Sequence, residues 1–221
     1  GDAEPPGGMD RNSGGADLNY TDDDLDSYET IWDGEVTKTN QADHERVVKA
    51  LKNIAEGNDL ESYMDIDNLL RYMAVHVFSV NEDSLSGTMA HNYYLYESDG
   101  KLNLIPWDYN LALGGMGGMG GGMPGGSGET EESSEATSVV NSPIDDAFSG
   151  TDFFDTLLEN ETYHSQYEAY LQQLVSEYIN GGGFDAFYER VRSQIDELVE
   201  TDPTAFYSYD EYETAAETLY Q

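Results

Sequence analysis

The sequence has 221 residues, and its 45 acidic side chains against nine basic ones give a formal net charge of −36 at pH 7. A field of that sign repels DNA, RNA and anionic membrane surfaces, which argues against nucleic acid as a partner. The same field repels ATP unless a divalent cation bridges carboxylate to phosphate. Any phosphate chemistry in this chain should therefore depend on a metal.

Length and apolar content predict one folded unit with appendages. A chain of this size buries roughly 70% of the surface that its unfolded form exposes. Hydrophobic residues make up 38% of the sequence, so its low mean hydropathy reflects an acidic surface more than a missing core. The lack of cysteine excludes disulfides, zinc–thiolate sites and cysteine nucleophiles. No apolar run approaches the length of a bilayer-spanning helix, so we expect no membrane insertion.

Two helices are predicted after an irregular start. Residues 1–16 contain glycines and prolines without apolar periodicity, which is typical of an irregular lead-in. Helical spacing begins at Gln41 and stops at Gly57. A second helix, capped by Asp65 or Asp67, is apolar around much of its circumference and should be central to the fold. The apolar residues of the two helices are Val47, Val48, Leu51 and Ile54, then Leu69, Leu70, Met73, Ala74 and Val77.

A β-hairpin and an insertion follow. The segments Asn92–Glu97 and Leu102–Pro106 alternate like strands and flank the turn dipeptide Asp99-Gly100. Residues 114–138 are dominated by glycine, methionine, glutamate and serine. That composition cannot repay the entropy of ordering, so we expect a flexible insertion, whose methionines need not bind a metal.

The rest of the chain predicts a helical tail without chemistry of its own. Gly181, Gly182, Gly183 and Pro203 interrupt it, and Ser208 can cap the last helix. The expected helices are Asp152–Leu158, Thr162–Ile179, Phe184–Val199 and Tyr209–Leu219.

Three polar residues lie where apolar elements end, the positions at which side chains commonly converge on a cleft. Asp83 ends the buried helix, Asn92 opens the first strand and Asp108 closes the second. Mg²⁺ is commonly bound by one or two carboxylates together with water and substrate phosphate, a role that suits Asp108 and Asn92. Phosphoryl transfer also needs a carboxylate that orients the acceptor hydroxyl and takes its proton, which Asp83 could supply.

These residues belong to longer motifs: Asp83-Ser84, His91-Asn92-Tyr93-Tyr94-Leu95-Tyr96, and Pro106-Trp107-Asp108-Tyr109-Asn110-Leu111-Ala112-Leu113-Gly114-Gly115. Together they resemble the CotH kinase family, the spore-coat-protein-H-like proteins. The resemblance extends to Asp65–Tyr72 and to the tail that begins near Ser142-Pro143-Ile144. It covers residues 17–221 except the insertion.

The resemblance implies an α+β, mostly helical fold: an atypical protein-kinase-like C-terminal lobe with a central hairpin and a helical tail. It implies transfer of phosphate from ATP, with Mg²⁺ or Mn²⁺, to Ser, Thr or Tyr hydroxyls of a protein substrate. It also implies an exported protein of the cell surface or spore coat. Asp83 matches the catalytic aspartate and Asp108 the metal-binding aspartate, and we extend the metal site to Asn92.

The sequence departs from the family pattern in two respects. Kinases of this kind carry an N-terminal lobe whose lysine grips the nucleotide phosphates, and no lysine here lies on a predicted strand before the motif. The lysines are Lys38, Lys49, Lys52 and Lys101. The family also commonly has aspartate and phenylalanine where this chain has Asn110 and Leu113. We therefore expect the nucleotide-clamping lobe to be absent and the isolated chain to have little activity.

Other interpretations remain open. A non-catalytic surface, spore-coat or matrix protein could use the same scaffold for binding or display. Paired carboxylates also serve glycoside hydrolysis, although no aromatic sugar platform is tied to the motif. His44, His76 and His164 lack metal-ligand spacing. The acidic run Asp22-Asp23-Asp24 lacks the pattern of a calcium loop.

Overall fold

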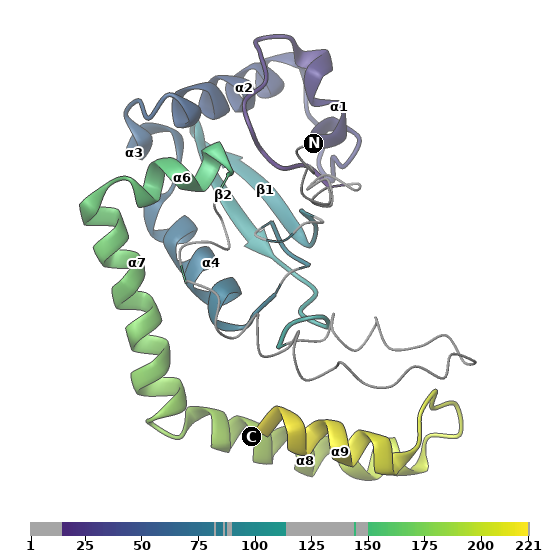
Figure 1. Ribbon diagram of the computed structural model, residues 1–221. Helices are drawn as coiled ribbons and strands as arrows, with labels where there is room; N and C mark the ends of the chain where they lie inside the picture. The colour runs from purple at the N-terminus through teal and green to yellow at the C-terminus, as the bar shows by residue number, and fades with distance from the viewer. Residues whose placement is uncertain are drawn as a thin grey trace, which may run out of the picture. The chain divides into compact units, whose positions relative to one another are not determined.

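The computed structural model describes residues 15–81, 83–85, 87, 90–113, 144 and 150–220 (Figure 1). The chain divides into two compact units, Gly1–Tyr170 and Leu171–Gln221. The predicted insertion at 114–138 and all but two residues of the predicted lead-in lie outside the described residues. Within the described part of the chain, every helix is too short or too polar to span a lipid bilayer.

Helix α2 (Gln41–Ala55) forms where the apolar spacing predicts it. Its start is fixed by a capping box: the Asn40 side chain accepts from the Ala42 amide at 2.9 Å, and the Asp43 carboxylate accepts from the Asn40 amide at 2.9 Å. Its end is followed by Gly57, whose φ of 66° suits glycine. All four predicted apolar side chains of this helix are buried.

Helix α4 (Ile66–Phe78) is the central helix of the first unit. The Asp65 carboxylate accepts from the Asn68 amide at 3.1 Å, so the first of the two predicted caps is the one used. The helix packs against strand β2 (Lys101–Pro106), and its buried residues are Leu69, Leu70, Tyr72, Met73, Ala74 and His76. The prediction of a central, largely buried helix is confirmed.

Strands β1 (Tyr93–Ser98) and β2 pair antiparallel, with Tyr93 opposite Pro106 and Ser98 opposite Lys101. The turn between them has φ of 54° at Asp99 and 84° at Gly100, which is the geometry of a type I′ hairpin turn. Leu102 and Leu104 are buried on the core face. The opposite face carries exposed side chains, Tyr94, Tyr96 and Ile105. The predicted hairpin is confirmed: the second strand ends at Pro106 as predicted, and the other three strand boundaries differ by one residue.

The first unit is completed by helix α6 (Asp152–Leu158), which packs on α2. Phe153, Phe154 and Leu157 of this helix are buried. Helix α7 (Glu161–Gln173) follows, and its Tyr167 is fully buried. Three short helices were not predicted from the sequence: η1 (Leu25–Tyr28), α1 (Glu29–Trp32) and α3 (Leu60–Tyr63).

The second unit contains the π-helix η4 (Leu174–Ile179), α8 (Gly183–Thr201) and α9 (Tyr209–Tyr220). Instead of continuing as an α-helix to Ile179 as predicted, the chain changes to a π-helix at Leu174. Ser208 caps α9 as predicted: its hydroxyl accepts from the Glu211 amide at 3.3 Å, and its amide donates to the Glu211 carboxylate at 2.7 Å. The architecture as a whole is α+β and mostly helical, as predicted.

Replacing Gly181 by alanine is expected to destabilise the second unit, because the new Cβ would lie 2.3 Å from the Glu177 carbonyl oxygen. Backbone must move to relieve such a contact, at a cost of roughly 1–3 kcal/mol. Gly182→Ala is the matched comparison: open space surrounds Gly182, so only its φ of 76° opposes a side chain, at about 1–2 kcal/mol. Urea unfolding monitored by far-UV circular dichroism measures both changes. Equal stability of Gly181→Ala and the wild type would contradict the expected clash.

Candidate active site

Asp83 lies in a turn after α4 and is held there by hydrogen bonds to the helix. Contrary to the sequence interpretation, it does not end the helix, which stops at Phe78. The Asn81 amide donates to the His76 carbonyl at 3.0 Å, and the Leu85 amide donates to the Tyr72 hydroxyl at 3.2 Å. Asp83 is only 8% exposed. The residues on both sides of this carboxylate are thus fixed to one buried helix.

Asn92 holds Asp83 at two points. The Asn92 Nδ2 donates to the Asp83 carbonyl oxygen at 2.9 Å and to Asp83 Oδ2 at 2.7 Å. With both donors directed at Asp83, the Asn92 Oδ1 is left as an acceptor for another ligand. Asp83 Oδ1 is buried without a hydrogen-bond partner among the described residues and lies 4.0 Å from His91 Nδ1. The predicted convergence of Asp83 and Asn92 is therefore seen in the structure.

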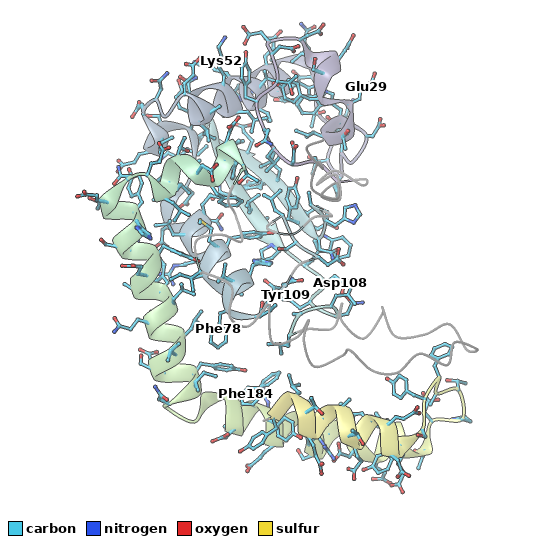
Figure 2. All side chains as sticks on the ribbon, in the orientation of Figure 1. Glu29, Lys52, Phe78, Asp108, Tyr109 and Phe184 are labelled. Carbon is cyan, nitrogen blue, oxygen red and sulfur yellow. The ribbon has the colours of Figure 1, made fainter. Side chains whose placement is uncertain are left out.

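Asp108 is joined to Asn92 through the backbone. The Trp107 amide donates to the Asn92 carbonyl at 3.0 Å, which extends the hairpin ladder by one step and places Asp108 just beyond it. The Asp108 side chain is exposed, and its Oδ1 accepts from the Asn110 amide at 3.3 Å. Figure 2 marks Asp108 and its neighbour Tyr109 in the segment after β2. No hydrogen bond joins the Asp108 side chain to Asp83 or Asn92 in the described part of the chain.

Unusual backbone conformations gather around these residues. Among the described residues, eight other than glycine have positive φ, and five of them adjoin or form the candidate site: Val80, Ala90, Asn92, Asp108 and Leu113. Each such conformation costs on the order of 1–3 kcal/mol and persists only where the surrounding structure enforces it. The cost is greatest for a β-branched residue such as Val80. This concentration of strain supports a functional role for the turn and the hairpin ends.

The side chains present fit a hard divalent cation. The Asn92 Oδ1, which accepts no hydrogen bond from the described residues, and the exposed Asp108 carboxylate are oxygen donors of the type that Mg²⁺ and Mn²⁺ prefer. The described residues contain no group of three or more His, Asp and Glu side chains arranged to hold a metal ion. The set therefore suits an ion bound by few protein ligands, with water and substrate phosphate as the others, and it does not suit a protein-only cage.

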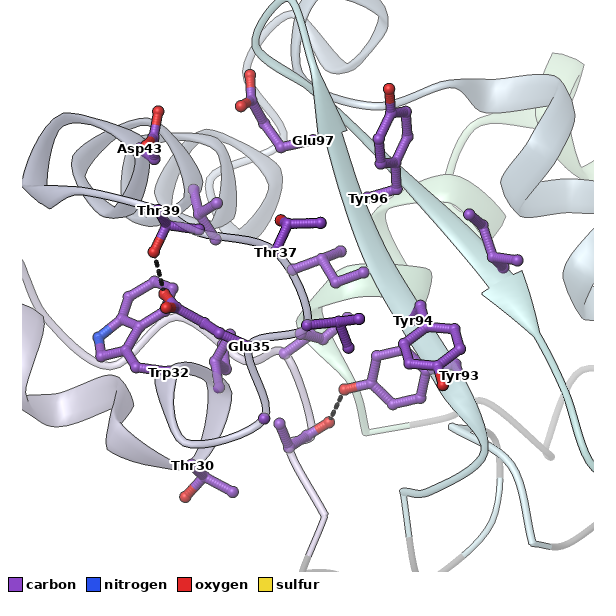
Figure 3. A pocket seen from close by; sticks show the side chains of 18 of the residues that line it. Thr30, Trp32, Glu35, Thr37, Thr39, Asp43, Tyr93, Tyr94, Tyr96 and Glu97 are labelled. Atoms are coloured by element: carbon purple, nitrogen blue, oxygen red, sulfur yellow. Dashed lines mark hydrogen bonds between the residues drawn. The ribbon is translucent and has the colours of Figure 1, made fainter.

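A pocket of about 760 Å³ begins at His91 and Asn92 and follows β1. Figure 3 shows its two walls: Trp32, Glu35, Thr37 and Thr39 on one side, and the β1 tyrosines on the other. The first wall is braced because the His44 ring stacks on Trp32, with ring centroids 3.9 Å apart, and forms an ion pair with Glu35. The hydrogen bonds of Glu35 with Thr39 and then His44 lower the pKa of the Glu35 carboxyl.

The pocket also contains an aromatic pair that was not predicted from the sequence. Tyr94 and Trp107 both line the pocket, stack with ring centroids 5.9 Å apart, and are each 45% exposed. The alternation along β1 could have indicated that Tyr94 lies on the face opposite Leu104. The position of Trp107 depends on the extra backbone pair with Asn92, which only the structure supplies.

The comparisons with known proteins agree with the motifs. The model of the family described as CotH kinase protein matches residues 9–221, nearly the whole chain. Searches of the curated proteins and of the solved structures gave no significant match. The matched region contains Asp83, Asn92 and Asp108 and every described helix and strand. The chain therefore belongs to the CotH kinase family.

Proposed function

We propose that the protein is an exported CotH-type kinase that transfers phosphate from ATP to Ser, Thr or Tyr hydroxyls of a protein, at the cell surface or in the spore coat. The observation that carries the proposal is the clamp of Asn92 on Asp83. It fixes the Asp83 backbone and Oδ2, while Oδ1 has no hydrogen-bond partner among the described residues. A carboxylate fixed in this way can act as the base for an acceptor hydroxyl.

Asn92 and Asp108 are proposed to hold Mg²⁺ or Mn²⁺ with the ATP phosphates. Bound there, the cation would neutralise phosphate charge and orient the transferred group. The described residues position these groups. Asn92 holds Asp83 by hydrogen bonds, and the backbone hydrogen bond from Trp107 to Asn92 fixes the position of Asp108 just after the hairpin. The departures at Asn110 and Leu113 leave both proposed ligands intact.

The pocket beside β1 is proposed to receive the nucleoside part of ATP. It begins at Asn92, and its exposed Tyr94 and Trp107 rings offer an apolar surface on which a base can stack. Lys38 also lines this pocket and forms no ion pair with the described residues. In so acidic a chain, a lysine without an ion pair among the described residues favours an anionic ligand there.

The distribution of lysines favours a second candidate, a non-catalytic surface or matrix protein that uses the same fold for display. Lys49 and Lys52 lie on α2, where Lys49 approaches the Tyr63 ring and Lys52 binds the Asp23 carboxylate at 2.7 Å. Lys101 begins β2. In the described part of the chain, no lysine lies on a strand before Asp83.

Calorimetric titration of the full-length protein with MgATP separates the two candidates. A kinase should bind MgATP. Asp108→Ala should weaken this binding by at least about tenfold, because loss of even an outer partner of a metal ligand costs that much. Asp99→Ala, which removes an exposed carboxylate at the far end of the hairpin, is the control and should bind like the wild type. If the wild-type protein gives no heat of binding at low salt, the non-catalytic display function is favoured. Equal incorporation of labelled phosphate by the wild type and Asp108→Ala would favour it as well.

A further inference from the structure

The His76 ring is stacked between the rings of Tyr72 and Tyr109, between the two halves of the candidate site. Its ring centroid is 3.9 Å from that of Tyr72, one turn earlier on α4, and 5.3 Å from that of Tyr109. The planes are inclined by 28° and 25°, so both contacts are stacked. His76 is 1% exposed, whereas Tyr109 is 39% exposed. The stack therefore extends from the core to the surface segment that follows Asp108.

The orientation of the His76 ring is fixed by one hydrogen bond. His76 Nδ1 lies 2.8 Å from the Tyr72 carbonyl oxygen, which can only accept, so Nδ1 carries the proton. His76 Nε2 is buried without a partner among the described residues. An unsatisfied buried nitrogen costs free energy that phenylalanine would not. The histidine thus has a cost in stability that core packing alone does not explain.

Both site segments are attached to the same stack. On the Asp83 side, the Tyr72 hydroxyl accepts from the Leu85 amide, and the His76 carbonyl accepts from the Asn81 amide. On the Asp108 side, Tyr109 packs on His76, and the Leu113 amide donates to the carbonyl of Ser79, just after α4. A shift of the ring would therefore move the two segments relative to each other.

We propose that His76 is a positioning residue that sets the place of Asp108 relative to Asp83 and Asn92 by stacking on Tyr109. This inference rests on the proposed metal-dependent function of the same site. His76 is not a ligand and does not touch the reacting groups. Its effect passes through Tyr109 to the neighbouring Asp108, in the way that outer contacts orient metal ligands in other proteins.

The test measures Mn²⁺ affinity of the full-length protein by electron paramagnetic resonance, and KM for MgATP apart from kcat. His76→Ala should weaken Mn²⁺ binding roughly tenfold and raise KM in proportion. His76→Phe, which retains a ring in the stack, should restore affinity to within about twofold of wild type. Val75→Ala, an exposed neighbour on α4, controls for changes in the helix and should bind like wild type.

If His76→Ala does not fold, Tyr109→Ala provides the same test, because Tyr109 is an exposed residue whose loss disturbs the core less. It should match His76→Ala, and the double variant should be no weaker than either single one, because both remove the same contact. Unchanged Mn²⁺ affinity in folded His76→Ala or Tyr109→Ala overturns the positioning role while leaving the proposed function in place. Wild-type protein that binds no Mn²⁺ overturns the proposed function and, with it, the inference.

Discussion

Asp83→Asn is expected to lower kcat for phosphoryl transfer by roughly 10²–10⁴-fold, the usual contribution of general acid–base catalysis. Asparagine has nearly the shape of aspartate, and its carbonyl oxygen can still accept the hydrogen bond from Asn92 Nδ2, which is 2.7 Å from Asp83 Oδ2. It cannot take a proton from an acceptor hydroxyl. Initial rates of labelled phosphate transfer from ATP to dephosphorylated casein measure the loss.

Two comparisons make the Asp83→Asn result specific. Mn²⁺ affinity should change little, which distinguishes loss of the base from loss of the metal site. Asp99→Asn makes the same chemical change in the hairpin turn, where asparagine accepts the positive φ of 54° as readily as aspartate, and it should retain the wild-type rate. Transfer by Asp83→Asn at the wild-type rate would show that Asp83 is not the base.

Acidification from pH 7 to pH 4 is expected to remove roughly 3 kcal/mol of stability through His76 alone. Burial lowers the pKa of His76 from 6.5 to about 4, with the hydrogen bond to the Tyr72 carbonyl opposing part of that change. Between these values the unfolded chain binds the proton that the folded chain excludes, so stability rises with pH. The contribution is complete above pH 6.5, is lost progressively down to about pH 4, and changes no further below it.

His76→Phe isolates this effect from that of the many carboxylates, because it has no proton to bind at position 76. Urea unfolding at pH 7 and pH 4 gives the free energy of unfolding for both proteins. The wild type should lose about 3 kcal/mol more than the variant across this interval. If both lose the same amount, the His76 ring is not excluded from protonation in the folded state.

The sequence predicts the larger elements because their signals are local. Apolar spacing and a capping aspartate define α4, and the Asp99-Gly100 turn defines the hairpin. The short helices η1 and α1 have no such signal, since four residues hold no periodicity. Their segment is held by tertiary contacts, such as the buried Tyr28 hydroxyl, which accepts from the Thr21 amide and donates to the Asp22 carbonyl. The π-helix at Leu174 also lacks a local signature.

The residues of the candidate site could be predicted from the sequence, but the contacts between them could not. The ends of the predicted elements indicate Asp83, Asn92 and Asp108. The direction of the Asn92 amide and the exposure of Asp108 follow from the path of the backbone, which composition does not specify. The sequence does not single out His76, because it has no metal-ligand spacing to another histidine. Its stack on Tyr109 depends on a segment over thirty residues later folding back on α4, which no sequence period indicates.

The hairpin places its turn at the opposite end from the two polar residues Asn92 and Asp108. Six residue pairs lie between the end that carries Asn92 and Asp108 and the Asp99-Gly100 turn, a length of roughly 17–20 Å. Changes of loop length at the turn would therefore leave the spacing of the two polar residues unaltered. The turn is a suitable position at which to insert a fluorophore or a peptide tag, and a reporter placed there would leave the candidate site undisturbed.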